Sequence, residues 1–184
     1  MKCRKTGSGE DKIGAMIEIE VKIRIQNLKE IRAKLEKLNA AVSRDRHHEV
    51  NTLFDYPSGQ LRLKKQAVRL RSIHKKHYLT FKGTPQKSRQ FKVREEYETE
   101  VRNLKGTRKI LESLGLKPTY QYEKFRTQYR SKRLKICLDE TEAGNYLELE
   151  GYRHEIVRFA KALGFLRRDF IKKDYIQLLE EDKK

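Results

Sequence analysis

The sequence predicts an α+β fold in which a few helices cover a large, mainly antiparallel sheet or barrel. Strand-like segments fill the middle of the 184-residue chain, and helical signals are few. In at least seven of these segments charged and apolar residues alternate, so each strand has one ionised face and one apolar face. The length predicts one domain over residues 16–184, after a loose polar leader at residues 1–15.

The composition is unusually charged but does not indicate disorder. Hydrophobic residues make up 36% of the chain and charged residues 38%, and the charges are patterned rather than blocked. The net charge of +18 implies an anionic partner such as a phosphate compound, a nucleic acid or a membrane surface. Between Tyr56 and Arg94 there are twelve Lys or Arg residues and no Asp or Glu.

The first strand is predicted at residues 16–25, where the alternation is strict. Every odd position from 17 to 25 is apolar, and the even positions hold Glu18, Glu20, Lys22 and Arg24. Side chains alternate between the faces of a strand, so these four charges share one face. Further strands are expected at 50–56, 67–73, 77–82, 90–101, 121–130, 133–140 and 145–150. The adjacent His47 and His48 are expected on the surface or in a loop.

Four helices are expected, and the first two belong to a repeat. Asn27 and Asn103 are predicted N-caps of two amphipathic helices, and Gly115 ends the second one. Asn-Leu-Lys at 27–29 returns at 103–105, and the same offset places Glu20 on Glu96. The chain thus resembles two related halves. The other helices are expected at 154–163 and 174–179.

The signs of the charges differ from strand to strand. Pairs of glutamates occur on the first and last strands, and pairs of cations occur on the middle strands. Carboxylate pairs suit Mg²⁺ or Mn²⁺, and Lys and Arg bind phosphate. If the sheet closes into a barrel with its charged faces inside, the glutamate pairs and the cation pairs would line one water-filled interior. A metal–polyphosphate site, a solvated charged sheet and a nucleic-acid surface all fit these residues, in that order of preference.

Six short motifs then appear in a characteristic order along residues 16 to 180. They are Glu18-Ile-Glu20-Val-Lys22, Val68-Arg69-Leu70-Arg71, Leu79-Thr-Phe-Lys82-Gly83, Lys124-Phe-Arg126, Leu138-Asp139-Glu140 and Glu148-Leu-Glu150. Together they resemble the CYTH proteins, also called triphosphate tunnel metalloenzymes. That family includes class IV adenylate cyclases, thiamine triphosphatases and inorganic triphosphatases.

The resemblance implies an eight-stranded antiparallel β-barrel, or tunnel, with helices packed on the outside. It implies a triphosphate held by Lys22, Arg69, Arg71, Lys82, Lys124 and Arg126, with Lys172 or Lys173 completing the site. It implies Mg²⁺ or Mn²⁺ held by Glu18, Glu20, Glu148 and Glu150, with Asp139 and either Glu96 or Glu98 at a second position.

The function expected from these residues is metal-dependent cleavage of a phosphoanhydride bond. The substrate would be tripolyphosphate or a nucleoside or thiamine triphosphate, and Glu20 and Lys22 are the candidate catalytic residues. Two alternatives stay open: a class IV adenylate cyclase that converts ATP to cyclic AMP and pyrophosphate, and a non-catalytic binder of polyphosphate or nucleic acid.

The remaining expectations concern the cellular location and the binding partners. The two cysteines, Cys3 and Cys137, do not have the spacing of a zinc or redox motif, and no apolar run spans a bilayer. A cytoplasmic protein without membrane partners is therefore expected. Nucleic acid is a disfavoured partner, and a homodimer is kept as an option.

Overall fold

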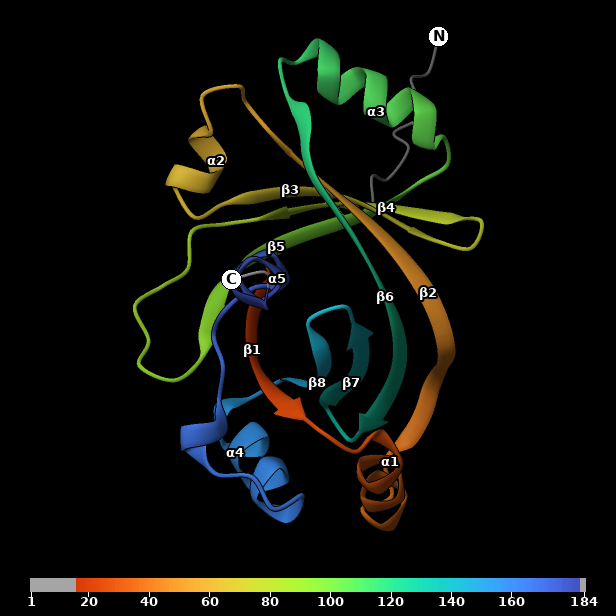
Figure 1. The fold of residues 1–184 in the computed structure, drawn as a ribbon, viewed down its shortest axis with the longest axis vertical. Coiled ribbons are helices and arrows are strands. Elements are labelled where there is room, and N and C mark those ends of the chain that lie inside the picture. Colours follow the sequence, from red (N-terminus) through yellow and green to blue (C-terminus); the bar gives the residue numbers. More distant parts are fainter. Residues whose placement is uncertain (1–15, 183–184) are drawn as a thin grey trace, which may run out of the picture.

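Eight antiparallel strands close into one barrel in the computed structural model, which describes residues 16–182 (Figure 1). The order around the barrel is β1-β5-β4-β3-β2-β6-β7-β8. The strands are β1 (Met16–Ile25), β2 (Ala41–Asp55), β3 (Ala67–Ile73), β4 (Lys76–Lys82), β5 (Lys92–Val101), β6 (Lys117–Ser131), β7 (Leu134–Thr141) and β8 (Gly144–Glu150). The predicted eight-stranded tunnel is therefore confirmed. The predicted leader at residues 1–15 lies outside the described residues.

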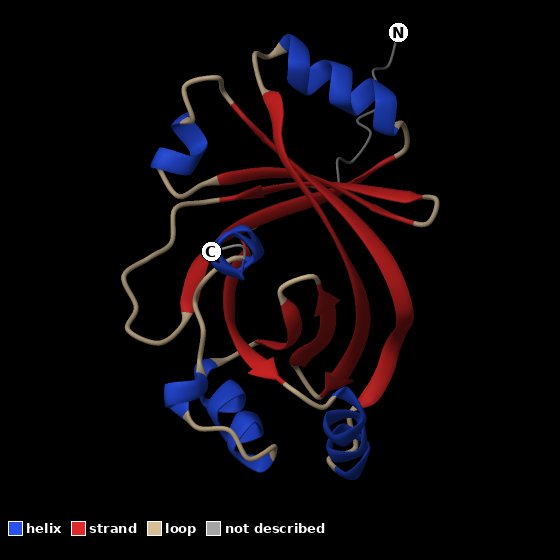
Figure 2. Ribbon diagram, in the orientation of Figure 1, coloured by secondary structure: helices blue, strands red, loops and turns tan. Residues whose placement is uncertain are grey.

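Most helices pack around the outside of the barrel, whereas the last one overlaps the barrel in this view and packs on Tyr146 of β8 (Figure 2). The helices are α1 (Leu28–Lys37), α2 (Gln60–Leu63), α3 (Leu104–Ser113), α4 (Arg153–Ala162), the short 3-10 helix η1 (Arg167–Asp169) and α5 (Tyr175–Asp182). The predicted caps are present: the side chain of Asn27 accepts a hydrogen bond from the Glu30 amide, and that of Asn103 accepts one from the Gly106 amide. No helix within residues 16–182 is long and apolar enough to cross a bilayer.

The two halves of the chain repeat each other with a constant offset of 76 residues. Met16–Ile25 corresponds to Lys92–Val101, Leu28–Lys37 to Leu104–Ser113, and Ala41–Asp55 to Lys117–Ser131. The halves are also interleaved. β1 pairs with β5 and β8 of the second half, whereas β5 pairs with β1 and with β4 of the first half. The predicted repeat is thus a repeat of structure, and the first strand of each half lies beside strands of the other.

The start of β2 differs from the prediction. The strand begins at Ala41 and not at residue 50, so His47 and His48 lie inside it. Irregularities in the pairing with β6 fall between Val42 and Arg44 and between Arg44 and His47. Such bulges break the alternation of side chains, which hid the strand in the sequence. Neither histidine lies in a loop, and His47 is 4% exposed, so the expectation is wrong for His47; the side chain of His48 is 41% exposed and lies on the surface as expected.

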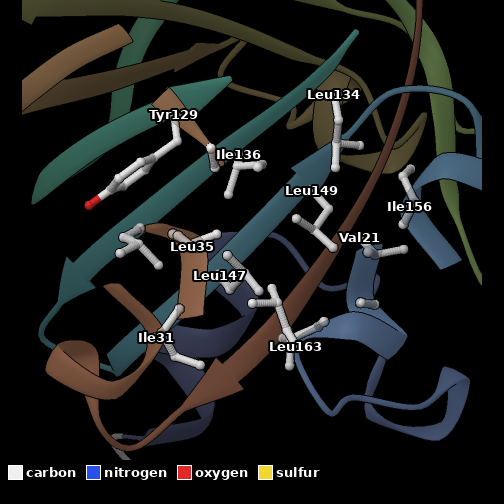
Figure 3. Close-up of a cluster of buried hydrophobic side chains, with 14 of the residues drawn as sticks. Val21, Ile31, Leu35, Tyr129, Leu134, Ile136, Leu147, Leu149, Ile156 and Leu163 are labelled. Atoms are coloured by element: carbon white, nitrogen blue, oxygen red, sulfur yellow. The ribbon is translucent and has the colours of Figure 1, made fainter. Parts of the chain in front are cut away.

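The hydrophobic core lies between the outside of the barrel and the helices. Val21 and Leu149 of the strands pack with Ile31 and Leu35 of α1, and with Ile156 of α4 (Figure 3). A second cluster joins the opposite end of the barrel to α3 through Leu111, Phe54 and Leu70, among others. The apolar faces of the strands therefore point outward, which leaves the charged faces to line the interior.

Candidate functional site

Charged side chains from all eight strands face the interior of the barrel. Their alternation with apolar residues puts Glu20 and Lys22 on the inner face of β1, while Val21 and Ile23 belong to the outer core. Many of these charges are buried, among them Glu20, Lys22, Glu49, Arg71, Lys82, Lys92, Arg94, Lys124, Arg126, Asp139 and Glu148. Buried charges are stable only when they are paired, so the pairs define the site.

One group of pairs is centred on Arg126 of β6. Its guanidinium contacts the carboxylates of Asp139 and Glu148, with an Nε to Oδ1 distance of 2.6 Å to Asp139. Lys124 adds a contact of 2.9 Å to Asp139. Lys22 of β1 contacts Glu148 at 3.0 Å. The motifs of the first, sixth, seventh and eighth strands therefore meet in one cluster, here called the Arg126 cluster.

A second group of pairs lies on the opposite wall. Arg71 donates to Glu98 at 2.8 Å, and Arg69 contacts the same carboxylate at 3.4 Å. Lys82 contacts Glu18 at 3.0 Å and also donates to Glu96. The basic motifs of β3 and β4 thus face the carboxylates of β1 and β5, and we call this group the Arg71 cluster.

Glu49 of β2 connects the two clusters. Its carboxylate lies 3.5 Å from Arg71, 3.7 Å from Lys124 and 3.2 Å from the Nε2 atom of His47. Burial alone would raise the pKa of this fully buried carboxyl, but the charges of Arg126 and Lys124 outweigh burial and hold the pKa well below its usual range. The sequence prediction missed Glu49 because it placed the start of β2 too late.

Other lining residues also escaped the prediction. Lys92 and Arg94 of β5 approach Glu20 and Glu18 at 3.9 and 3.7 Å. The alternation in residues 90–101 places both inward, which was the signal available in the sequence. Tyr175 donates to Asp139, and its ring lies 4.5 Å from the Lys124 ammonium. No local pattern indicates that role, because only the fold brings the start of α5 to the tunnel.

Three predicted residues lie apart from these clusters. Glu150 pairs with Lys135 at 2.7 Å. Lys172 is exposed and donates to the Ser88 carbonyl at 2.9 Å. Lys173 is exposed as well and pairs with Glu181 at 2.6 Å. The structure therefore does not bring Lys172 or Lys173 together with the other predicted site residues.

The lining of the tunnel is almost neutral. The inward cations are Lys22, Arg69, Arg71, Lys82, Lys92, Arg94, Lys124, Arg126 and Lys135. The inward carboxylates are Glu18, Glu20, Glu49, Glu96, Glu98, Asp139, Glu148 and Glu150. Most of the net charge of +18 therefore lies outside this lining.

Several donors in the tunnel make no hydrogen bond. Among residues 16–182, the Nε atoms of Arg69, Arg71 and Arg94 are buried and have no hydrogen-bond partner, and that of Arg94 has only the ion pair with Glu18 at 3.7 Å. Buried polar atoms in folded proteins almost always have hydrogen-bond partners, so those without one indicate a ligand or water. These donors come from strands β3 and β5, and they suit an anion between them.

Two carboxylates suit a divalent metal ion. Within residues 16–182 no three His, Cys, Asp or Glu side chains form a ready-made metal centre. Glu20 and Glu148 nevertheless lie near each other, since both contact the Lys22 ammonium, at 3.3 and 3.0 Å. Mg²⁺ often takes one or two protein carboxylates and completes its shell with water and phosphate oxygens. The donor set therefore fits Mg²⁺ or Mn²⁺.

Comparisons with known proteins agree with this geometry. A family model described as the CYTH domain matches residues 16–170. A Methanocaldococcus jannaschii protein, named provisionally as an adenylate cyclase, is 27% identical over 174 residues, or 89% of this chain and 98% of that protein.

Solved structures share the fold. A Vibrio parahaemolyticus protein, also named provisionally as an adenylate cyclase, has a TM-score of 0.81 at 19% identity and covers 91% of this chain and 99% of its own. A Hippeastrum protein, described as a provisional adenylyl cyclase with a dominant triphosphatase activity, has a TM-score of 0.67 at 21% identity, over 89% of this chain and 95% of its own. Since the family model spans most of the sequence and its motifs line the tunnel, the protein belongs to the CYTH domain family.

Proposed function

We propose that the tunnel binds the triphosphate group of a small molecule and cleaves one of its phosphoanhydride bonds with the help of Mg²⁺ or Mn²⁺. The observation that carries this proposal is the set of buried guanidinium Nε atoms without hydrogen bonds on Arg69, Arg71 and Arg94. The tunnel that holds them is also lined by Glu20 and Glu148. A triphosphate needs both cations for its oxygens and carboxylates for its metal.

Cleavage of a phosphoanhydride depends more on positioning and charge neutralisation than on covalent catalysis. Arg69 and Arg71 on one wall, with Lys124 and Arg126 on the other, would hold the phosphates that do not react. Their present carboxylate partners keep these side chains extended into the tunnel, so little reorganisation is needed when an anion binds. Glu20 is the first candidate for orienting the attacking water, and Lys22 would neutralise charge beside it.

Glu20 and Glu148 are the residues proposed to hold the metal, with Glu18, Asp139 and Glu150 as further candidates. When bound at these carboxylates, Mg²⁺ or Mn²⁺ would supply Lewis-acid chemistry, which neutralises phosphate charge and makes water more acidic. Lys22 contacts both first candidates, so it would remain next to the charges that bind the ion.

A second candidate function is the conversion of ATP to cyclic AMP and pyrophosphate. The name of the Methanocaldococcus jannaschii relative favours it, and the triphosphatase activity described for the Hippeastrum protein favours hydrolysis. The same cationic walls would serve both reactions. The third candidate, a non-catalytic binder of polyphosphate or nucleic acid, would use the walls without turnover.

A product analysis tests these candidates. Purified protein is incubated with tripolyphosphate, ATP or thiamine triphosphate, each with Mg²⁺ or Mn²⁺, and the products are separated by anion-exchange chromatography. Orthophosphate as the main product supports the proposal. Cyclic AMP and pyrophosphate as the main products from ATP would favour the cyclase, and binding without any product would favour the binder.

Glu20→Gln is expected to lower kcat/KM for tripolyphosphate about 100-fold or more, because it removes one charged metal ligand but keeps the shape of the side chain. The measurement is phosphate release as a function of Mg²⁺ concentration. Glu36→Gln, on the exposed side of α1, is the matched control and should behave as wild type. Full activity of Glu20→Gln would contradict a role of Glu20 in catalysis or metal binding.

Lys92 is expected to make phosphate binding sensitive to pH. Burial, supported by the charge of Lys22, lowers the pKa of Lys92 to about 8. The affinity for tripolyphosphate should therefore fall as pH rises through about 8, where Lys92 becomes neutral. The free energy of unfolding of the free protein should instead rise between about pH 8 and 10.4. In that range Lys92 is protonated only in the unfolded chain, so raising the pH disfavours unfolding.

Calorimetric titrations with tripolyphosphate across this pH range measure the first effect, and urea unfolding measures the second. The Lys92→Met variant should lose both pH dependences. An affinity that falls equally steeply in Lys92→Met would assign the effect to another group.

A further inference from the structure

Strand β2 carries two fully buried polar side chains at neighbouring positions of the tunnel wall. Glu49 and Asn51 are both 0% exposed. The irregularities in the pairing of β2 lie outside residues 47–53, so these two side chains keep the alternation of a regular strand and share one face. Glu49 contacts Arg71 and Lys124 inside the tunnel, and Asn51 therefore faces the tunnel as well.

The atoms of these two side chains that lack hydrogen bonds are mainly acceptors. The Oε2 atom of Glu49 has no hydrogen-bond partner within residues 16–182, although it forms an ion pair with Lys124 at 3.7 Å. The Oδ1 and Nδ2 atoms of Asn51 also lack hydrogen-bond partners in the described part of the chain. Buried polar atoms without hydrogen bonds are rare in folded proteins, so these three atoms indicate a bound molecule.

The molecule that satisfies the two acceptors has to donate hydrogen bonds. A fully ionised phosphate chain carries only acceptor oxygens, so it cannot donate to Oε2 of Glu49 or to Oδ1 of Asn51. Water donates two hydrogen bonds and is present in any tunnel that admits a charged substrate. The chemistry of this part of the wall therefore suits a water molecule.

Donors for phosphate lie directly beside these acceptors. Strand β2 lies between β3 and β6 in the barrel (Figure 1), and Asn51 is the direct neighbour of Arg71 in the pairing with β3. Direct neighbours in an antiparallel pair have their side chains on the same face, about 5 Å apart. The buried Nε atoms of Arg71 and of Arg69, the next inward residue of β3, have no hydrogen bond. A position for water thus adjoins a position for phosphate.

We propose that Asn51 and Glu49 hold the water that attacks the terminal phosphate in the tunnel. Oδ1 of Asn51 and Oε2 of Glu49 would accept the two hydrogens of this water, which directs an oxygen lone pair at the phosphorus. Nδ2 of Asn51 would donate to an oxygen of the same phosphoryl group, next to Arg71. This inference rests on the proposed function. Glu20, the first candidate above for orienting the water, would then act on the metal alone.

The two side chains would orient the water and would not keep its proton. The water oxygen forms a bond to the terminal phosphorus, and the bond from this phosphorus to the bridging oxygen breaks, with its electron pair going to the bridging oxygen. One hydrogen stays on the orthophosphate, and the other proton passes to a phosphate oxygen of the products. Glu49 is too weak a base to hold that proton, because the charges of Arg126 and Lys124 keep its pKa well below its usual range.

The variant Asn51→Leu tests this assignment with tripolyphosphate and Mg²⁺. It keeps the size of the side chain but removes both amide atoms. The kcat should fall about tenfold or more, whereas KM should change less than about threefold, because the cations that bind phosphate remain. The melting temperature should stay at or above that of wild type, since a buried amide without hydrogen bonds is removed. Thr52→Val, on the outer face of the same strand, is the matched control and should keep both kcat and KM.

Two further variants should separate kcat from KM in different directions. Asn51→Asp keeps an acceptor for the water but adds a negative charge beside the phosphate, so KM should rise about tenfold while kcat stays within about threefold of wild type. Glu49→Gln removes a charge that competes with phosphate for Arg71 and Lys124, so KM should fall and kcat should fall about tenfold. A structural role of Asn51 would instead lower the melting temperature and reduce kcat in Asn51→Leu and Asn51→Asp alike.

The outcomes separate this inference from the proposed function. If wild type releases orthophosphate and Asn51→Leu has an unchanged kcat, the water site is overturned and the proposed function stands. If wild type releases no orthophosphate from any triphosphate with Mg²⁺ or Mn²⁺, both are overturned. Excess Mg²⁺ should partly restore Glu20→Gln, which lacks a metal ligand, but not Asn51→Leu. Recovery of Asn51→Leu by excess Mg²⁺ would assign Asn51 to the metal and overturn the water site.

Discussion

Replacement of Arg126 by alanine is expected to destabilise the protein by about 3–5 kcal/mol and to abolish triphosphate cleavage. Arg126 is 5% exposed and contacts both Asp139, which is fully buried, and Glu148. Without the guanidinium, two buried carboxylates lose their main counter-charge. The substitution also removes a cation proposed to bind phosphate, with an expected loss of about 2–5 kcal/mol in triphosphate binding.

The destabilisation should depend on pH in a defined direction. Burial alone would raise the pKa of Glu148, but the charges of Arg126, Lys22 and Lys124 outweigh burial and hold it well below its usual range. A depressed pKa stabilises the folded state above the unfolded pKa of about 4.3, and this stabilisation is lost as pH falls. The difference between wild type and Arg126→Ala should therefore shrink as pH falls below about 4.

Urea unfolding at several pH values measures both effects. The matched control is Arg46→Ala, because Arg46 also holds a carboxylate, Glu140, with two hydrogen bonds, but its side chain is 45% exposed. This exposed pair should contribute no more than about 1 kcal/mol. Similar losses in both variants would show that the tunnel charges are solvated like surface charges.

Replacement of Leu147 by alanine is expected to destabilise the protein by about 2–5 kcal/mol and to leave the KM for tripolyphosphate unchanged. Leu147 is fully buried in the outer core, where it lies opposite Ile23 of β1 and Leu138 of β7. Its side chain points away from the tunnel, since its neighbours in β8, Tyr146 and Glu148, point the other way. Deletion of the buried methyl groups leaves a cavity under the helices.

Thermal and urea unfolding measure the loss, and steady-state kinetics at a temperature well below the transition measure KM. Exposed Leu114→Ala, just after α3, serves as the control and should change stability by less than about 0.5 kcal/mol. A loss below about 1 kcal/mol for Leu147→Ala would mean that the outer layer is not the main source of stability.

Most of the fold could be predicted from local sequence patterns. The alternation in residues 16–25 and 67–73 predicted β1 and β3 at their observed bounds, and Asn27 and Asn103 predicted the starts of two helices. The helix α2 was missed because it is short and is capped by Asp55, a side chain at the end of the preceding strand. Asp55 accepts hydrogen bonds from the amides of residues 61 and 62 at its start.

The candidate site was only partly predictable. Residues within the six motifs meet in the Arg126 and Arg71 clusters, because their alternation and the order of strands bring them inward. Glu49 was not predicted because the bulges in β2 break the alternation of side chains. Tyr175 was not predicted because its contact with Asp139 depends on how the chain runs after α4. The choice between Lys172 and Lys173 could not be made from sequence, because both positions depend on how that same segment is held.

The exchange of first strands between the two halves has a consequence for how the chain acquires its shape. While the protein leaves the ribosome, β1 emerges first but must wait for β5 and β8 before it has a neighbour on either side. A nascent chain that ends after β4 therefore carries an unpaired strand edge and cannot complete half a barrel. Pairings between such distant segments predict slow folding, because β1 cannot be placed in the barrel before the second half of the chain is present.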